Sequence, residues 1–195
     1  MPGEIIVVDG GSADATRGTA ASAGARVITT QRGRGAQLAA GVAGTRLKWL
    51  LLLHADTRLG SGWQDVVRGQ MASGPHRAGY FRFHLASSDR RARHLERAVA
   101  ARCRLFALPY GDQGLLIHRD LLNTIGGIRP LALMEDVDLV RRLGRRRLVA
   151  LDAPAITSPA RWERDGWYRR SFRNMIYLLL YLAGVPTSYI QRLYE

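Results

Sequence analysis

The stretch Trp49-Leu50-Leu51-Leu52-Leu53-His54-Ala55-Asp56-Thr57 joins an unbroken apolar run to a carboxylate. A run of this length without helical spacing predicts a strand that is covered on both faces. Asp56 then follows the carboxyl end of that strand, where open α/β sheets bind their ligands. A carboxylate there suits a hard divalent cation that carries phosphate oxygens. The alternative is that Asp56 only caps the next turn or helix, so the stretch alone leaves metal binding open.

A second buried-strand pattern, Glu4 to Val8, ends in Asp9-Gly10-Gly11-Ser12. The glycines allow the backbone to approach a ligand closely, and Ser12 can cap a helix that runs to about Ala23. As a bare turn the segment needs no function. The combination of strand, acid, glycines and cap nevertheless favours a nucleotide site that includes Asp9 and Gly10. The Gly-x-Gly-x-x-Gly fingerprint is absent, which disfavours a nicotinamide cofactor.

Two groups of arginines are candidates for binding phosphate. Arg32 and Arg34 are set among glycines just before a helix of small residues, where backbone N–H groups and guanidinium groups converge on an anion. The alternative is an exposed basic turn. Further on, Arg161, Trp162 and Arg164 combine two cations with an aromatic ring, a grouping suited to a diphosphate and to ring stacking.

Acidic and polar residues form two further candidate sites. Glu135 and Asp136 open a helix that is predicted to run to about Leu143. The helix dipole alone explains acids in a first turn. Adjacent acids that follow apolar residues can also supply a general base. The loop Gly111-Asp112-Gln113 precedes a predicted strand, and polar side chains on such loops often touch substrate. A plain turn explains this loop equally well.

The composition predicts one domain with an unusual charge. The chain has 195 residues and a formal net charge of +13, and Lys48 is its only lysine. The arginine fork suits phosphate, so the candidate partners are a nucleoside diphosphate, an anionic membrane surface or nucleic acid. An arginine-rich background with solvated faces is the alternative. The single cysteine, Cys103, excludes an internal disulfide and a cysteine-based zinc site.

The residues from Trp167 to Ala183 predict a helix whose later part is apolar all round, which indicates burial or contact with a membrane. The helix is too short to span a bilayer, so a membrane-bound version would lie in the interface. No signal peptide is recognisable. Core packing and interfacial contact both stay open.

Taken in order, these segments resemble family 2 glycosyltransferases over about residues 4 to 164. Val7 to Thr16 resembles the segment that ends their nucleotide-binding strand, and His54-Ala55-Asp56 resembles the position of their metal-binding Asp-x-Asp motif. Glu135-Asp136-Val137-Asp138-Leu139 resembles the motif that holds their catalytic base, and Arg161-Trp162 is similar to a pair near the donor diphosphate. A Gly-Asp-Gln-Gly segment is shared with a bacterial subgroup.

The resemblance implies an α/β glycosyltransferase-A fold, in which a Rossmann-like, mostly parallel sheet is flanked by helices. It implies a nucleotide-diphosphate sugar donor, Mg²⁺ or Mn²⁺, and inversion at the anomeric carbon. The implied roles are metal binding for Asp56, general base for Asp136 with support from Glu135, and acceptor contact for the Gly111–Gln113 loop. The residues assigned to the donor are Asp9, Gly10, Arg32, Arg34, Arg161, Trp162 and Arg164. Residues 1–164 would form the transferase domain, and residues 165–195 a helical extension packed on it or at a membrane surface.

Two departures from the family pattern lead to further expectations. Family members have an earlier, central strand for which we expect no counterpart here, and Ala55 replaces the first acid of the metal motif. The alternative function is therefore a catalytically impaired, transferase-like binding module at a membrane or protein partner. A nucleic-acid-binding protein is a third hypothesis, which the lack of any recognised motif disfavours. We expect a cytoplasmic enzyme, peripheral on the inner face of the membrane if its acceptor is lipid-linked.

Overall fold

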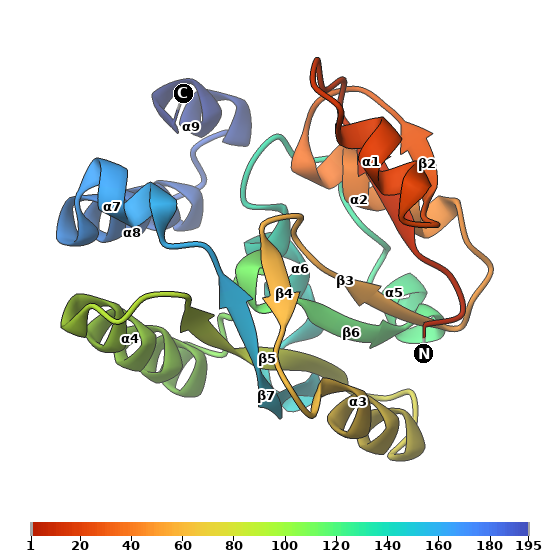
Figure 1. The fold of residues 1–195 in the computed structure, drawn as a ribbon. Helices are drawn as coiled ribbons and strands as arrows, with labels where there is room; N and C mark the ends of the chain where they lie inside the picture. The colour runs from red at the N-terminus through yellow and green to blue at the C-terminus, as the bar shows by residue number, and fades with distance from the viewer. Residues whose placement is uncertain (1, 195) are drawn as a thin grey trace.

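The computed structural model describes residues 2–194 and shows an α/β arrangement of two sheets with flanking helices (Figure 1). The strands are β1 (Ile6–Asp9), β2 (Arg26–Thr29), β3 (Trp49–Leu52), β4 (Thr57–Leu59), β5 (Ala78–Leu85), β6 (Leu115–His118) and β7 (Leu148–Thr157). The α-helices are α1 (Thr16–Ser22), α2 (Arg34–Ala43), α3 (Trp63–Ala72), α4 (Arg90–Phe106), α5 (Arg119–Thr124), α6 (Glu135–Leu143), α7 (Ala160–Asp165), α8 (Trp167–Leu182) and α9 (Thr187–Tyr194). Two 3₁₀ turns, η1 (Gly111–Gln113) and η2 (Arg145–Arg147), complete the described elements.

The strands form a two-stranded sheet, β1-β2, and a five-stranded sheet of order β3-β6-β5-β7-β4. The pairs β1–β2 and β5–β7 are parallel, whereas β3–β6, β5–β6 and β4–β7 are antiparallel. The α/β class is as predicted, but the larger sheet is mixed rather than mostly parallel. The reason is that an apolar run reports burial on both faces and carries no information about strand direction.

Strands β1 and β3 each lie at an edge of their sheet. Within residues 2–194, β1 pairs with β2 alone and β3 pairs with β6 alone. Each of these strands therefore has one edge without a ladder of hydrogen bonds in the described part of the chain.

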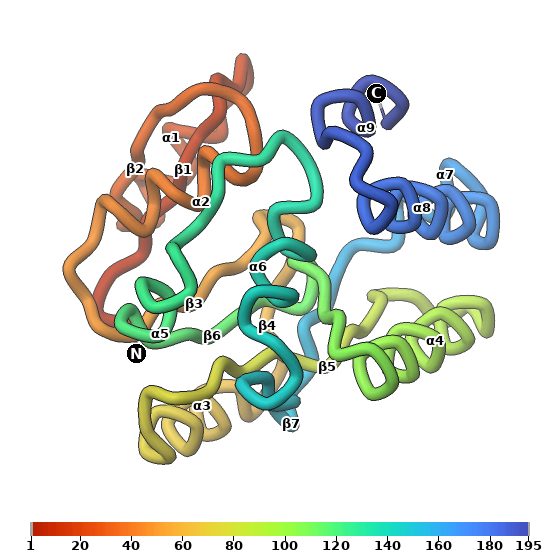
Figure 2. The backbone as a smooth tube through the Cα atoms, turned by 180° about the vertical axis from the view of Figure 1, so that it is seen from behind, coloured from red at the N-terminus to blue at the C-terminus, as the bar shows by residue number. Residues whose placement is uncertain are grey.

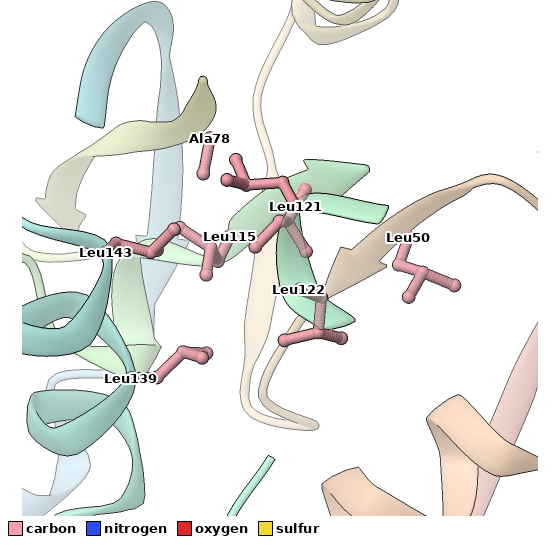
Figure 3. Packing of buried hydrophobic residues seen from close by; sticks show 8 residues of the cluster. Leu50, Ala78, Leu115, Leu121, Leu122, Leu139 and Leu143 are labelled. Carbon is pink, nitrogen blue, oxygen red and sulfur yellow. The ribbon is translucent and has the colours of Figure 1, made fainter. Parts of the chain in front are cut away.

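Helix α6 is held against the larger sheet by a cluster of leucines (Figure 3). Leu139 and Leu143 of α6 pack with Leu115 and Ile117 of β6 and with Leu50 of β3. Each of these side chains is less than a tenth exposed, and burial of one leucine stabilises the fold by about 1.5–3 kcal/mol. The packing fixes the N-terminal end of α6, which carries Glu135 and Asp136.

The C-terminal helices pack on the rest of the chain through a smaller cluster. Tyr177 of α8 and Ile190 of α9 are buried against Leu133, and the Tyr177 hydroxyl donates to the backbone oxygen of Leu193 at 2.6 Å. Figures 1 and 2 place α7, α8 and α9 on the opposite side of the molecule from α1 and α2. Among the described residues, no helix has the length and apolar character needed to cross a membrane.

Candidate active site

A cleft is lined by residues of α2, α6, α7, α8 and α9 and of the β3–β4 turn. Figure 1 shows α2 on one side of this turn and α7, α8 and α9 on the other. The cleft brings together side chains that are far apart in the sequence. Its charged lining residues are Arg34, Asp56, Asp112, Asp136, Arg161 and Arg170. Four of these residues were predicted as site residues from four different segments: Arg34, Asp56, Asp136 and Arg161. The fold therefore brings these segments together at one cleft.

Asp136 is oriented by backbone groups at the wall of the cleft. The Gly111 N–H donates to one carboxylate oxygen at 2.7 Å, and the Val137 N–H donates to the other at 2.7 Å. Gly111 has no room for a side chain, since the imidazole of His54 occupies the position that a Cβ would take. The Gly111 loop therefore positions the predicted base directly.

Glu135 lies behind Asp136 and does not line the cleft. Its side chain is 3% exposed, and neither carboxylate oxygen has a hydrogen-bond partner in the described part of the chain. Burial, followed by repulsion from Asp136, raises the pKa of Glu135 to about 7. The preceding residue, Met134, has a left-handed backbone with φ of 65°, an uncommon conformation for a side-chain-bearing residue that is often found at functional sites.

Asp112 also faces the cleft, and its Oδ1 has no hydrogen-bond partner among residues 2–194. Burial raises the pKa of Asp112 to about 6, and the charges of Asp136 and Asp56 add to this effect. Burial and the charge of Arg34 lower the pKa of His54, whose Nε2 atom is buried and likewise has no partner in this range. A pair of buried, incompletely bonded polar groups at a cleft is typical of a functional site.

Asp56 is at the tip of the β3–β4 turn, with its carboxylate 37% exposed and 3.6 Å from the guanidinium of Arg161. Arg161 and Trp162 both come from α7 and line the cleft. The Trp162 ring packs near Phe83, with 6.0 Å between the ring centroids. The pair Asp56–Arg161 thus joins the predicted metal position to the predicted diphosphate position.

Arg34 is the first residue of α2 and lines the cleft, whereas Arg32 is exposed in the preceding turn and does not line it. The charges of Glu135 and Asp136 act against the effect of burial and raise the pKa of Arg34. The next residue, Gly35, lets the helix touch the 129–131 segment, because a Cβ there would lie 2.6 Å from the backbone of Leu131. This close approach brings Arg34 near Glu135 and Asp136 at the start of α6.

Asp9 and Gly10 do not line this cleft. The Asp9 carboxylate is 3% exposed and accepts the backbone N–H groups of Gly11 and Ser12 at 3.1 Å. Hydrogen bonds from Ser12 and Gly11 hold the pKa of Asp9 below its usual value. Asp9 therefore closes its own turn after β1, and Gly10 is packed against Arg32 and Gln37.

Two other predicted residues also lie away from the cleft. The amide oxygen of Gln113 accepts the Tyr110 N–H at 3.2 Å, and its amide nitrogen donates to the backbone oxygen of Phe81 at 3.0 Å. The side chain is 2% exposed, so it supports the loop from inside. Arg164 is exposed and pairs with Asp165 at 2.8 Å.

The sequence did not predict the C-terminal lining of the cleft, which comprises Arg170, Asn174, Tyr177 and Tyr194. Arg170 is 5% exposed, donates to Asp165 at 2.6 Å and to the Tyr194 hydroxyl at 3.2 Å, and lies 5.4 Å from the Trp162 ring. A signal was present, because residues 170, 174 and 177 are spaced to lie on one side of a helix.

Comparison with solved structures identifies the fold. Glucosyl-3-phosphoglycerate synthase from Mycobacterium tuberculosis, in a complex with Mn²⁺ and UDP-glucose, superposes with a TM-score of 0.59 at 21% identity, over 94% of this chain and 69% of that chain. A mycobacterial protein of known crystal structure superposes with a TM-score of 0.54 at 24% identity, over 80% of this chain and 55% of that one. These similarities show the glycosyltransferase-A fold.

The family follows from the sequence itself. The model of glycosyl transferase family 2 matches residues 2–134, and the chain belongs to this family. No curated protein matches the chain significantly. The family match includes Asp9, Arg34, Asp56 and Asp112 but ends before Asp136.

Proposed function

We propose that this chain is an inverting glycosyltransferase that moves a sugar from a nucleotide-diphosphate donor to a hydroxyl group of an acceptor. The observation that supports this most strongly is the shared cleft, in which Asp136 lies on one wall and the Asp56–Arg161 pair on another. Similar structures bind UDP-glucose, so a uridine nucleotide is the first donor to test. In this reaction the acceptor oxygen forms a bond to the anomeric carbon as the bond to the diphosphate oxygen breaks.

Each residue has a defined task in this proposal. Asp136, held by the Gly111 and Val137 N–H groups, takes the proton of the acceptor hydroxyl. Arg34 and Arg161 stabilise the negative charge that develops on the leaving diphosphate. Glu135 lies behind Asp136 and supports it electrostatically.

The residues fit a divalent cation only when it is shared with a diphosphate. No cluster of three or more metal-ligating side chains occurs within residues 2–194, so the protein alone provides few ligands. Asp56 is accessible at the cleft and would hold Mg²⁺ or Mn²⁺ together with phosphate oxygens, which such ions prefer. When bound, the ion would supply charge neutralisation at the diphosphate.

The metal proposal has a test that does not need turnover. We expect Mn²⁺ alone to bind weakly and Mn²⁺ with UDP to bind at least about tenfold more tightly, because the diphosphate completes the ligand set. The loss of the free Mn²⁺ signal in electron paramagnetic resonance measures Mn²⁺ binding with and without UDP. Asp56→Asn should abolish the UDP-dependent gain, and Asp152→Asn, at an exposed carboxylate on β7, serves as the control. Equal binding by Asp56→Asn would contradict this role.

Asp136 is tested by turnover. We expect Asp136→Asn to lower the rate of sugar transfer from UDP-sugars, or of their hydrolysis, by about 10²–10⁴-fold. The reason is that a positioned general base contributes a factor of this size. Donor binding, followed by thermal shift, should change little. The alternative, a binding module without catalysis, predicts donor binding but no turnover that depends on Asp136 in the wild-type protein.

The acceptor and the place of action stay predictions. The apolar C-terminal helix favours a lipid-linked acceptor and contact with a membrane surface. The predicted location is cytoplasmic, peripheral on the inner face of the membrane if the acceptor is lipid-linked. Glucosyl-3-phosphoglycerate synthase has been crystallised with phosphoglyceric acid, so a small phosphorylated acceptor is the competing possibility. Assays with both acceptor classes separate them.

A further inference from the structure

The outer surface of α8 and α9 is apolar. Of the thirteen large hydrophobic side chains that are exposed among residues 2–194, eight belong to these two helices. They are Tyr168, Phe172, Met175, Ile176, Leu179, Leu182, Tyr189 and Leu193, which we call the α8–α9 face. Phe172 is 69% exposed and Leu179 is 57% exposed.

The exposed apolar side chains of α8 lie on one side of the helix. At about 100° per residue, the six members on α8 fall within a stripe about 120° wide. The opposite side of α8 is buried through Trp167, Arg170, Tyr177 and Leu178. A helix on the surface of a soluble protein normally turns a polar side to water, whereas α8 turns an apolar side outward. Figures 1 and 2 show α8 and α9 at the periphery of the molecule.

The charged residues of α8 and α9 are all arginines. Residues 166–194 contain four arginines and no acidic residue. Arg169 and Arg192 are exposed, and helical spacing places Arg169 at the margin of the stripe. Tyrosine and phenylalanine next to arginine on one helix face are typical of helices that lie in a bilayer interface, because the rings enter the headgroup region and the cations meet anionic lipid.

We propose that the α8–α9 face docks on the surface of an anionic lipid bilayer. A second copy of the chain fits this face less well, since a symmetric pair would bring the same arginines together in a protein that already carries a net charge of +13. Docking is shallow, because the described helices are too short to span. The inner side of the same helices supplies Arg170, Tyr177 and Tyr194 to the cleft, so docking brings the cleft next to the lipid surface.

This inference does not depend on the proposed function, and its test needs no substrate. The full chain is sedimented with vesicles of phosphatidylcholine alone or with about 30% phosphatidylglycerol, whose surface attracts basic segments. We expect at least about tenfold stronger binding to the anionic vesicles. The double variant Phe172→Ser with Leu179→Ser should weaken that binding by about tenfold or more, because two apolar contacts are lost.

Controls separate docking from unfolding and from general charge. Met71→Ser changes an exposed apolar residue of α3 and should leave vesicle binding unchanged. Met71→Ser and the Phe172/Leu179 double variant should both keep the wild-type melting temperature, since the substituted side chains are exposed. Arg169→Gln should weaken binding by about fivefold, the effect of one cation near an anionic surface.

Three outcomes would overturn the proposal. One is no binding to the anionic vesicles, and another is binding that the Phe172/Leu179 double variant leaves intact. The third is a wild-type dimer in light scattering that this double variant dissociates, which would assign the face to a second copy.

Discussion

Glu135 is the buried acid beside the proposed base, and its titration makes the folded state sensitive to pH. Its pKa is raised from 4.5 to about 7, so the folded protein binds this proton more tightly than the unfolded chain. The free energy of unfolding should therefore fall as the pH rises from about 5 to 8. At about 1.4 kcal/mol for each pH unit between the two pKa values, the contribution is up to about 3 kcal/mol.

Substitution of this one residue tests the effect. We expect Glu135→Gln to match the wild type within about 1 kcal/mol at pH 5 and to exceed it by about 2–3 kcal/mol at pH 8, because the amide does not ionise. Urea unfolding across this pH range measures it. Asp120→Asn, at an exposed carboxylate on α5, is the control and should follow the wild-type curve. A stability difference that stays constant with pH would refute the interpretation.

At the scale of elements, the start of α2 determines where Arg34 lies. Gly35 is buried against the 129–131 segment, and its N–H donates to the backbone oxygen of Leu131 at 3.3 Å. An added methyl group would lie 2.6 Å from backbone atoms of Arg129 and Leu131, so α2 would have to move away. This contact ties the N-terminal part of the molecule to the segment that leads into α6.

We therefore expect Gly35→Ala to destabilise the protein by about 1–3 kcal/mol, the usual cost of overpacking, and to weaken donor binding because Arg34 shifts. Thermal unfolding and nucleotide titration measure the two effects. The matched control is Gly69→Ala in α3, where a Cβ meets nothing within 4 Å. That change should stabilise the protein by about 0.5–1 kcal/mol, since alanine favours a helix. The contact argument is wrong if both variants behave alike.

At the scale of the whole molecule, the C-terminal helices complete the cleft across from α2. Ile190 is fully buried with Leu133 and Tyr177, and α9 also carries Tyr194, whose hydroxyl accepts from Arg170 at 3.2 Å. The position of Tyr194 therefore depends on packing at Ile190.

Ile190→Ala should cost about 2–5 kcal/mol of stability and weaken donor or acceptor binding, because α9 loosens at the cleft. Leu193→Ala, at an exposed position of the same helix, should stay within about 0.5 kcal/mol of the wild type. Denaturant unfolding with ligand titration reports both quantities. Full ligand affinity in a destabilised Ile190→Ala protein would show that α9 is not part of the functional site.

Much of the local structure could be predicted from the sequence. The unbroken apolar run from Trp49 predicted β3, which spans Trp49–Leu52, and the acidic first turn predicted α6, which spans Glu135–Leu143. The chain motifs also indicated the family, which the family match confirms. These features depend on neighbours in the sequence, because backbone period, capping and burial on a face are local properties.

Tertiary structure alone decided which distant side chains meet. In the folded protein, Asp9 accepts backbone N–H groups of its own turn and Gln113 is buried in the interior. Arg170 and Tyr194 line the cleft. The tertiary structure also made the larger sheet mixed and left the outer face of α8 uncovered. The physical reason is that strand direction and helix docking follow from packing summed over the whole chain, so spacing within one segment cannot report them.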